Sequence, residues 1–592
     1  MIDYFCLRIS DIVRSSVRLC AVILCCTLLG AGAFGALAAL SGCSMQPYPA
    51  ADDRAAGDAA AGGGANGAAQ DAGPPINSAI YSNDYIIDDG PVKGGSLRVY
   101  STPPDTYNPL LTRNVYTQAM FSLVYEGLAG IDANLGAEPR LAESWAPSDD
   151  GLTWDIELCS GIKWHDGLAL NAYDVIDTIE RIRSYGELSP YAEMLSNIKS
   201  EAALSGSEIR LTLKKENAFT PNDLIFPVVP SHIAIEALDG ESGAANLKSA
   251  LIGTGPYRFD SYVNGRGVTL TASDKKSVAP PYIDSVSFQF YEPQDTALPQ
   301  FRNRSVDLFF SRTFDYSRYR LSSEMRIRQY CEREFIFVAL NCAKGITQAK
   351  SVRQAIARMV DRQKLIDSAL GGRGIPAEFP VQPDNSLYGA ITANLPFDPQ
   401  AARSILENAG YRLDDGTFYG DAGNGWQKLG PTLIVNDSDT DRCALADGLA
   451  DMLSEYGVQI TVSREPADTV VQKVAAGAYD MALLSYRTSQ YPDMTELYSY
   501  PWREGGAPMN PARYQNEYAD VLSHELFTVY DGQDRQVVFS ELAAVLQDDA
   551  PCVGICFRAS SLVCSEVLRG RIRPNAWAPL NYFGDWYIVD YR

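Results

Sequence analysis

Histidine, catalytic signatures and positive charge are all scarce in this chain. Only three histidines, His165, His232 and His524, occur in 592 residues, and they are scattered along the chain. The sequence therefore argues against a His-rich metal site and against a histidine-dependent hydrolase. The sequence also lacks a G-x-S-x-G nucleophile elbow and a G-x-x-x-x-G-K-[ST] phosphate loop. We expect a binding protein with no catalytic residues, no cofactor and no metal.

Basic residues are outnumbered by acidic ones along the whole chain. The formal net charge is −23. Without residues 1–42, which hold three basic and two acidic residues, 47 Lys and Arg face 71 Asp and Glu, a net charge of −24. No basic run remains. This balance excludes nucleic acid and an anionic membrane surface as partners of the mature protein.

One long apolar run is present, and it lies at the N-terminus. Three arginines precede the uncharged segment from Leu19 to Leu40, and Ser41-Gly42-Cys43 follows it. This order is typical of a secretory signal, and Leu40-Ser41-Gly42-Cys43 resembles a bacterial lipobox. The resemblance implies that residues 1–42 are removed and that Cys43 carries a diacylglycerol, whose two chains suffice for stable anchoring. An uncleaved signal-anchor helix remains the alternative, because the apolar run nearly spans a bilayer.

Cysteines are few beyond this point. An odd number remains after Cys43, so at least one is unpaired outside the cell. Cys552 and Cys556 have neither the redox C-x-x-C spacing nor a common zinc spacing. We expect one or two structural disulfides and otherwise buried thiols among the seven: Cys159, Cys331, Cys342, Cys443, Cys552, Cys556 and Cys564.

A segment of low complexity separates the lipobox from the rest of the chain. Between Ala50 and Ala72, 16 of 23 residues are Ala or Gly. Such a composition cannot bury enough apolar surface to offset the entropy of folding. We interpret residues 43–93 as a disordered tether.

Strands and helices alternate in the remaining 500 residues. Alternating apolar patterns predict strands at 96–100, 286–290, 433–435, 458–462 and 481–484. Capping and stop signals predict helices after Asn171, near Ser351 with a stop at Gly371-Gly372, and between Asp398 and Gly410. The pattern indicates an α/β fold.

Eight sequence blocks occur in an order that is specific to one family. They are GGSLRVY with YNPL (107–110), LVYEGL (123–128), LAESWAPSDDGLTWDIEL (141–158), GIKWHDGLALNAYDV (161–175), GTGPYRF (253–259), SVRQAIARMVDRQKLI with GGRG (351–374), FDPQAARSILENAGY (397–411), and AAGAYDMALLSY before QYPDM. The chain resembles the family 5 extracellular solute-binding proteins, the peptide/nickel-type receptors of ABC importers.

The resemblance implies a two-lobed periplasmic-binding-protein-like fold (type II, cluster C) that closes on its ligand at a hinge. Three domains are then expected. Domain I is discontinuous and comprises residues 94–128, 253–335 and 566–592, the inserted domain II comprises 129–252, and domain III, the far lobe, comprises 336–565.

Two further motifs are predicted to be structural. His165-Asp166-Gly167 lies between apolar runs and is typical of a turn in which Gly167 has a positive φ. A ligand contact through His165 is the less favoured alternative. Gly253-x-Gly255-Pro256 is interpreted as the bend where the chain returns to domain I.

The ligand site is expected between the lobes, but its charged anchors differ from the family pattern. In the dipeptide-binding relatives, the resemblance implies an acidic residue that pairs with the α-amino group of the ligand; this chain has Gln490 at that position. It also implies a basic residue that pairs with the ligand carboxylate; this chain has Asn436 there. Arg487 and Asp493 either take over these roles or are solvated loop charges. A longer peptide, held through its backbone, fits the loss of both anchors. The predicted ligand-binding residues are Tyr107, Asn108, Asn436, Tyr486, Arg487, Gln490, Asp493 and Trp502.

The sequence thus predicts a monomeric, lipid-anchored extracellular receptor that passes peptides to an ABC permease and ATPase. Two alternatives stay open. One is a receptor of the same fold for an oligosaccharide, opine or metal chelate. The other is a surface sensor or adhesin without a transporter.

Overall fold

The computed structural model describes residues 90–238, 241–273, 280–292, 297–391, 395–421, 425–499 and 510–589. The predicted signal peptide, Cys43, most of the tether and Trp502 lie outside these ranges. Within them, no helix has both the length and the apolarity needed to cross a membrane.

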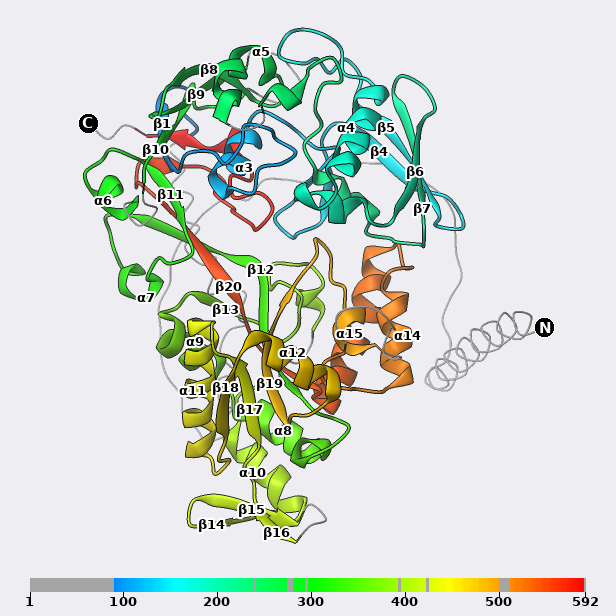
Figure 1. The fold of residues 1–592 in the computed structure, drawn as a ribbon, viewed down its shortest axis with the longest axis vertical. Helices are drawn as coiled ribbons and strands as arrows, with labels where there is room; N and C mark the ends of the chain where they lie inside the picture. Colours follow the sequence, from blue (N-terminus) through cyan, green and yellow to red (C-terminus); the bar gives the residue numbers. More distant parts are fainter. Residues whose placement is uncertain are drawn as a thin grey trace, which may run out of the picture. The chain divides into compact units, whose positions relative to one another are not determined.

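One sheet of 11 strands extends through both halves of the described chain (Figure 1). Its order is β18-β17-β19-β12-β20-β11-β1-β10-β9-β8, and β13 pairs with β20 beside this path. The strands are β1 (Ser96–Ser101), β8 (Tyr257–Val263), β9 (Gly267–Ala272), β10 (Ser285–Phe290), β11 (Leu308–Ser311), β12 (Arg326–Leu340), β13 (Gly374–Pro376), β17 (Thr432–Asn436), β18 (Thr461–Glu465), β19 (Met481–Arg487) and β20 (Cys552–Cys564). The long antiparallel strands β12 and β20 connect the two lobes.

The first lobe, in the upper part of Figure 1, has one hydrophobic core drawn from residues 97–330 and 562–586. Besides its share of the large sheet, it contains a four-stranded sheet in the order β4-β5-β7-β6 and two hairpins. Its remaining strands are β2 (Ala129–Ile131), β3 (Ala137–Pro139), β4 (Ala142–Pro147), β5 (Thr153–Leu158), β6 (Ile198–Ala203), β7 (Glu208–Leu213), β21 (Leu568–Arg569) and β22 (Tyr587–Ile588). Its α-helices are α3 (Val115–Phe121), α4 (Ala172–Tyr185), α5 (Leu247–Ala250), α6 (Ala297–Arg302) and α7 (Tyr316–Tyr319). Its 3-10 helices are η1 (Gly186–Leu188), η2 (Ala192–Leu195), η3 (Thr220–Ile225), η4 (Ile235–Leu238), η5 (Glu241–Asn246) and η9 (Phe583–Asp585).

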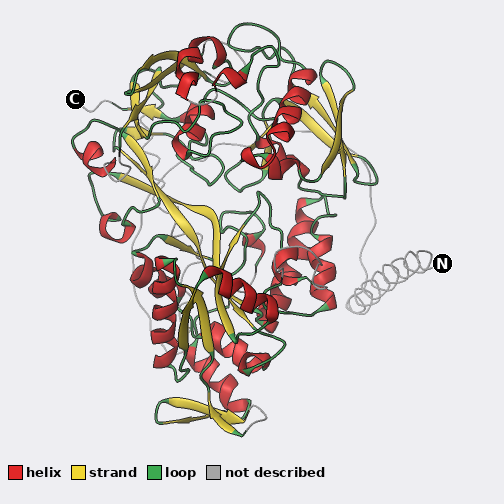
Figure 2. Ribbon diagram, in the orientation of Figure 1, coloured by secondary structure: helices red, strands yellow, loops and turns green. Residues whose placement is uncertain are grey.

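The second lobe has its own cores, formed almost entirely by residues 331–559. Figure 2 shows helices around its part of the sheet. They are α8 (Lys350–Arg358), α9 (Arg362–Leu370), α10 (Pro399–Asn408), α11 (Thr440–Glu455), α12 (Ala467–Ala476), α13 (Thr495–Tyr498), α14 (Glu517–Glu525) and α15 (Gly532–Asp549), with the 3-10 turns η7 (Ile346–Gln348) and η8 (Tyr388–Ala390). A small sheet of β14 (Arg412–Asp414), β15 (Thr417–Asp421) and β16 (Trp426–Lys428) completes this lobe.

Side chains of β17 alternate between two helices. Leu433 and Val435 belong to the core that includes α11, whereas Ile434 packs with Val470 and Val474 of α12. Because successive side chains of a strand point to opposite faces, one strand is covered on both sides. β17 pairs in parallel with β18 and β19. Strands and helices therefore form the predicted α/β arrangement.

The predicted helix starts are confirmed. Asn171 and Asp174 form a capping box at the start of α4, and Asp398 caps α10 with a proline in its first turn. The helix predicted from Ser351 to Gly371 is two helices, because Asp361 caps a new one, α9. The strand predicted at 458–462 begins later, at Thr461, after Gly457 takes a positive φ of 88°.

The two glycine motifs meet at one place in the first lobe. Gly167 has a φ of 102°, as the turn requires. His165 Nε2 lies 2.9 Å from the Gly255 carbonyl, and its Nδ1 accepts from the Gly253 amide at 3.2 Å. The Gly255 amide donates to the Val124 carbonyl at 2.8 Å, and a Cβ on Gly253 would lie 1.8 Å from that oxygen. The glycines thus permit the close return of the chain to the LVYEGL segment.

The expectation of disulfides is wrong for the described residues. All seven cysteines after Cys43 are free thiols. Several lie within β12 and β20, where buried thiols act as small apolar side chains. Burial raises the pKa of Cys556 to about 12 and that of Cys342 to about 11.

The pairing of β12 with β20 is interrupted where the strands pass between the lobes. Cys331 lies opposite Ala559, but the next paired residue on β12, Phe335, lies opposite Phe557. Three residues of β12 therefore face a single residue of β20, Arg558. Such an irregularity bends and twists a strand.

The predicted limits of the three domains stay a prediction.

Candidate functional site

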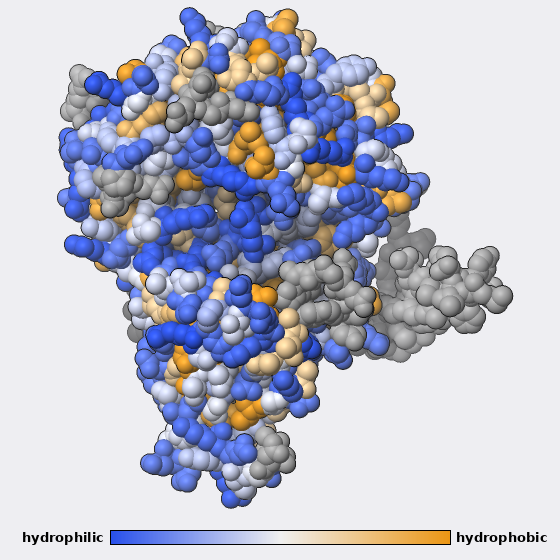
Figure 3. All heavy atoms as spheres, viewed as in Figure 1, coloured by the Kyte–Doolittle hydropathy of each residue, from blue (hydrophilic) through white to orange (hydrophobic). Residues whose placement is uncertain are grey.

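A cavity of about 1000 Å³ lies between the two lobes. Its walls come from α3, η2, the crossing strands β12 and β20, the end of β19, the start of α11 and a loop before η9. On the face shown in Figure 3, hydrophilic residues are concentrated at the level where the lobes meet. The described lining residues are Arg113, Val115, Gln118, Phe121, Ser122, Tyr125, Gly127, Pro190, Tyr191, Met194, Ile225, Pro227, Arg312, Thr313, Tyr330, Glu332, Arg333, Glu334, Arg373, Thr440, Asp441, Ser485, Arg487, Arg558, Ala559, Ala576, Trp577 and Pro579.

The charged lining is predominantly positive, although the chain as a whole is acidic. Six arginines and three carboxylates line the cavity among the described residues. The three carboxylates are Glu332, Glu334 and Asp441, and each is engaged by an arginine. Outside these pairs the described residues contain no group of three or more His, Cys, Asp or Glu side chains arranged to hold a metal.

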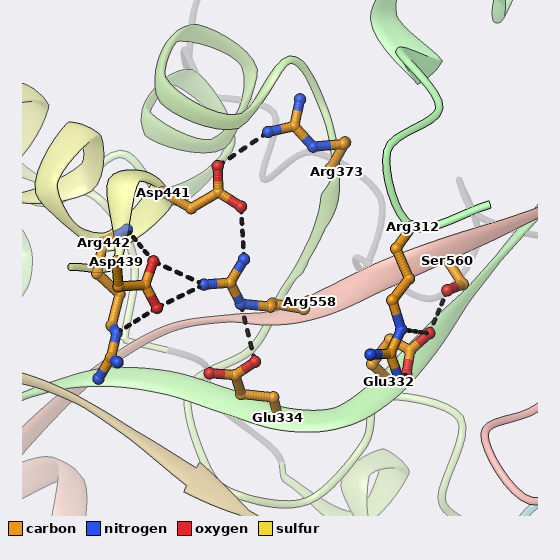
Figure 4. Close-up of polar contacts among 9 residues, drawn as sticks. All are labelled: Arg312, Glu332, Glu334, Arg373, Asp439, Asp441, Arg442, Arg558 and Ser560. Atoms are coloured by element: carbon orange, nitrogen blue, oxygen red, sulfur yellow. Dashed lines mark hydrogen bonds and ion pairs between the residues drawn. The ribbon is translucent and has the colours of Figure 1, made fainter. Parts of the chain in front are cut away.

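Arg558 is the centre of the larger charge network (Figure 4). Its guanidinium lies 2.9 Å from Glu334, 2.9 Å from Asp439 and 2.5 Å from Asp441. Burial alone would lower the pKa of Arg558, but these three carboxylates outweigh burial and raise it. Arg373 adds a second contact to Asp441 at 3.0 Å. The network holds β20 against the start of α11.

A smaller network joins the first lobe to the crossing strands. Arg312, which follows β11, donates to both oxygens of Glu332 at 3.2 and 2.7 Å. The Ser560 hydroxyl of β20 donates to the same carboxylate (Figure 4). Burial would lower the pKa of Arg312, yet Glu332 outweighs it and the pKa is raised. Such paired arginines are largely neutralised before a ligand arrives.

Arg333 and Arg487, like Arg113, are not held by a carboxylate of the cavity wall; Arg113 donates instead to the Glu187 carbonyl at 2.6 Å. Arg333 Nε donates to the Thr488 carbonyl at 2.8 Å, and its Nη2 lies 3.5 Å from Glu193. That nitrogen is buried and makes no hydrogen bond to a described residue. Burial, followed by the charge of Arg487, lowers the pKa of Arg333. Arg487 is exposed to the cavity.

Apolar and aromatic side chains form the remaining wall. Phe121, Tyr191, Met194 and Trp577 are among them. The Trp577 indole nitrogen is buried without a hydrogen-bond partner among the described residues. An indole N–H is a donor only, so it is available to a carbonyl group of a ligand.

A second contact joins the lobes beside the cavity. Phe219, from the first lobe, stacks on Tyr491 at 5.3 Å and packs edge-on against Phe527 at 6.0 Å. The Arg535 guanidinium covers the ring at 4.2 Å, and the Ala218 amide donates to the Phe527 carbonyl at 2.7 Å. Phe219 thereby belongs to a hydrophobic core of the second lobe.

Of the predicted ligand-binding residues within the described chain, Arg487 alone lines the cavity. Tyr107 is buried in the first-lobe core, where it packs edge-on against Tyr262, and its amide donates to the Leu238 carbonyl. Asn108 is fully buried and donates to the Tyr185 hydroxyl at 3.0 Å. These two residues support the fold of the segment that leads into α3.

The other predicted residues make contacts within the second lobe or at its edge. Asn436 accepts from the Ser438 amide and hydroxyl. Gln490 is buried, and its carbonyl accepts from Asn222 at 3.3 Å. Asp493 accepts from the Thr495 amide at 2.9 Å. Burial, strengthened by Glu496 and Asp493, raises the pKa of Tyr486.

Sequence reasoning missed most of the charged lining. The signals were present, because charge interrupts two otherwise apolar strands. Cys331-Glu332-Arg333-Glu334 precedes an apolar run in β12, and Arg558 is the one charged residue in β20. An ionisable residue inside a buried strand needs a partner. No such signal marked Arg312, Arg373 or Asp441.

Comparisons with known proteins agree with this architecture. The family described as bacterial extracellular solute-binding proteins, family 5 Middle, matches residues 136–508. The oligopeptide-binding protein AppA of Bacillus subtilis (strain 168) is 24% identical over 81% of this chain and 89% of its own length. The nickel-binding periplasmic protein of Escherichia coli (strain K12) is 24% identical over 83% of this chain and 92% of its own length. The crystal structure of the ABC transporter substrate-binding protein CtaP from Listeria monocytogenes covers 84% of this chain and all of its own, with a TM-score of 0.63 and 22% identity.

Proposed function

Because the chain belongs to the bacterial extracellular solute-binding proteins of family 5 and has their two-lobed fold, we propose that it captures peptides outside the cytoplasmic membrane and delivers them to an ABC importer. The ligand lies in the cavity between the lobes, and the lobes close on it about β12 and β20. The permease and ATPase of the importer are its membrane partners.

The cavity carries this proposal. A volume of about 1000 Å³ is at the upper end of the range for small-molecule sites, so it has room for a ligand of several residues. Its wall combines aromatic surface with hydrogen-bond donors, including the unpaired Trp577 indole. Peptide side chains and peptide carbonyls would use both. The name of the AppA relative, an oligopeptide-binding protein, supports the same ligand class.

The receptor is tethered rather than free. We base this on Leu40-Ser41-Gly42-Cys43, after which Cys43 would be lipidated and would anchor the protein to the outer face of the cytoplasmic membrane. The Ala/Gly-rich tether then separates the lobes from the lipid. In this function the protein works as a monomer and binds its ligand without changing it chemically.

A receptor for another solute is the second candidate. The nickel-binding relative supports it, since its name assigns a metal ligand to a member of the same family. A cavity with three excess positive charges would suit an anionic metal chelate. A surface sensor without a transporter would use the same cavity and differ only in its partners.

Identifying the ligand that is bound to the protein when it is isolated from its own cells distinguishes these candidates. The full chain is purified from its native membranes in mild detergent, denatured, and the released small molecules are identified by mass spectrometry. We expect peptides of more than two residues. A chelate or sugar found in stoichiometric amount, with no peptide, would overturn the peptide assignment. Loss of the ligand's uptake on deletion of the adjacent permease would support transport over sensing.

A further inference from the structure

We infer that Arg333 and Arg487 form a subsite for an anionic group of the ligand, so that the receptor selects acidic peptides. The inference rests on the proposed peptide-binding function and adds the charge of the ligand to it. The chemistry required is a carboxylate. It can come from an Asp or Glu side chain or from the C-terminus of the peptide.

The first argument is the distribution of charge in the cavity. All three lining carboxylates are already neutralised, Glu332 by Arg312 and the other two by Arg558, with Arg373 also on Asp441. Three lining arginines are left without a carboxylate within 3 Å among the described residues: Arg113, whose guanidinium donates to the Glu187 carbonyl at 2.6 Å, and the two of the proposed subsite, Arg333 and Arg487. A net charge of −23 over the chain makes this local excess of positive charge a property of the cavity and not of the surface in general.

The second argument is the way Arg333 is held. Its Nε donates to the Thr488 carbonyl, and the Thr488 amide donates back to the Arg333 carbonyl, both at 2.8 Å. The guanidinium is thereby fixed between the middle of β12 and the residue that follows β19, while Nη2 is buried without a hydrogen bond to a described residue. The nearest carboxylate, Glu193, is 3.5 Å away and its side chain is 69% exposed, so water weakens its effect. A buried guanidinium nitrogen without a hydrogen bond is costly, and a ligand oxygen at hydrogen-bond distance would satisfy it.

The third argument is the position of Arg487. In the strand register it lies opposite Glu334, but that carboxylate is engaged by Arg558 at 2.9 Å. The charge of Arg487 repels that of Arg333 and so contributes to lowering the pKa of Arg333. Two guanidinium groups that line the same cavity and influence each other's protonation repel each other until an anion binds near both. A carboxylate there would accept charge-assisted hydrogen bonds from both.

Calorimetry with the full chain in detergent tests the subsite. The probes are three end-blocked pentapeptides that differ only at their second and fourth residues: Ac-AEAEA-amide, Ac-AQAQA-amide and Ac-AKAKA-amide. A fourth probe, Ac-AQAQA with a free carboxylate, separates the two sources. We expect the Glu peptide to bind about 10- to 100-fold tighter than the Gln peptide, and the Lys peptide to bind most weakly. If the gain appears instead with the free C-terminus, the same subsite takes the chain end.

Variants identify the residues responsible. Arg487→Gln should remove most of the preference for the acidic probe, and it carries little risk to folding because Arg487 is exposed. Arg333→Gln should have the same effect, and thermal unfolding verifies that it folds. Arg403→Gln is the matched control, since it removes an exposed arginine of α10 that pairs only with Glu407. A preference for the acidic probe that survives both cavity variants would overturn the inference.

The outcome for the subsite is separable from the outcome for the peptide function. Equal binding of the Glu, Gln and Lys peptides and of the probe with a free carboxylate would overturn the anion subsite and leave peptide capture intact. Binding of citrate that depends on Arg487, with no binding of any pentapeptide, would support the subsite and overturn peptide capture. If neither pentapeptides nor citrate bind, both are overturned.

Discussion

Phe219 offers the sharpest test of how the lobes are held together. Its ring is 6% exposed because it is inserted between Tyr491 and Phe527 of the second lobe. When the lobes separate, the ring becomes exposed to water. Truncation by Phe219→Ala therefore acts mainly on the closed state. Burying a phenylalanine stabilises by about 1.5–3 kcal/mol, and an aromatic pair adds about 0.5–1.5 kcal/mol.

Together these terms predict that the closed state loses about 2–4 kcal/mol. A ligand that binds only the closed state must then supply this difference from its own binding energy. At 1.36 kcal/mol for each tenfold change, its affinity falls about 30- to 1000-fold. Because no residue of the cavity wall is altered, the ligand's contacts in the closed complex stay the same.

Two measurements check this prediction. Calorimetry gives the affinity for whichever peptide binds the unmodified protein, and X-ray scattering gives the decrease in radius of gyration at saturation. Phe397→Ala is the matched control, since this residue is 41% exposed and its ring packs edge-on against Tyr456 of the same lobe. An unchanged affinity and an unchanged decrease in radius for Phe219→Ala would refute the reasoning, because the contact would then be the same in both states.

Four further predictions follow from other parts of the chain. Gly253→Ala should destabilise the fold by about 3 kcal/mol or more, because its Cβ would overlap the Val124 carbonyl; Gly206→Ala, which meets nothing within 4 Å, is the control in thermal unfolding. Burial, followed by the nearby Glu193, raises the pKa of Asp223 well above its ordinary value while Arg333 opposes the shift. Between the unfolded-state pKa and the higher folded-state pKa of Asp223, the folded protein binds more protons, so the contribution of Asp223 to stability declines as pH rises above about 4. Asp223→Asn should remove this decline from the plot of melting temperature against pH. An unaltered plot would contradict the prediction. Cys43→Ala should release the protein from the membrane fraction or leave it as precursor, and continued incorporation of labelled fatty acid would argue against lipidation at Cys43. Unmodified dipeptides should bind negligibly beside longer peptides, because every described carboxylate of the cavity wall is already paired with an arginine and none is left for the α-amino group of a dipeptide; sub-micromolar calorimetric affinity for several dipeptides would show that the cavity arginines anchor them.

Local signals in the sequence predicted the elements well, because each depends on a few neighbouring residues. The capping box at Asn171, the cap and proline of α10 and the positive φ of Gly167 are set by short-range hydrogen bonds and backbone sterics. The break between α8 and α9 was missed because Asp361 is an ordinary polar residue until its carboxylate caps a helix.

The cavity was harder to predict, because its residues converge from distant segments. Arg312, Arg373 and Arg558 have little in common in the sequence, yet all three face carboxylates of the same cavity. Tyr107 and Asn108 belong to a well-matched block, but their side chains are used to build the first lobe. Sequence similarity located the blocks and gave no information on which side chains point into the cavity.

The interruption between β12 and β20 has a consequence for how such a receptor can diversify. The three residues left without individual partners on β20 are Glu332, Arg333 and Glu334, and all three line the cavity. In the proposed function, the segment that bends when the lobes close would therefore also contact the ligand. A substitution here changes selectivity and mechanics together, whereas a substitution at Trp577 or Met194 changes selectivity alone. New ligand preferences should therefore arise first through substitutions of cavity residues outside β12 and β20. A substitution within these two strands should be accompanied by a second one that restores the movement of the lobes.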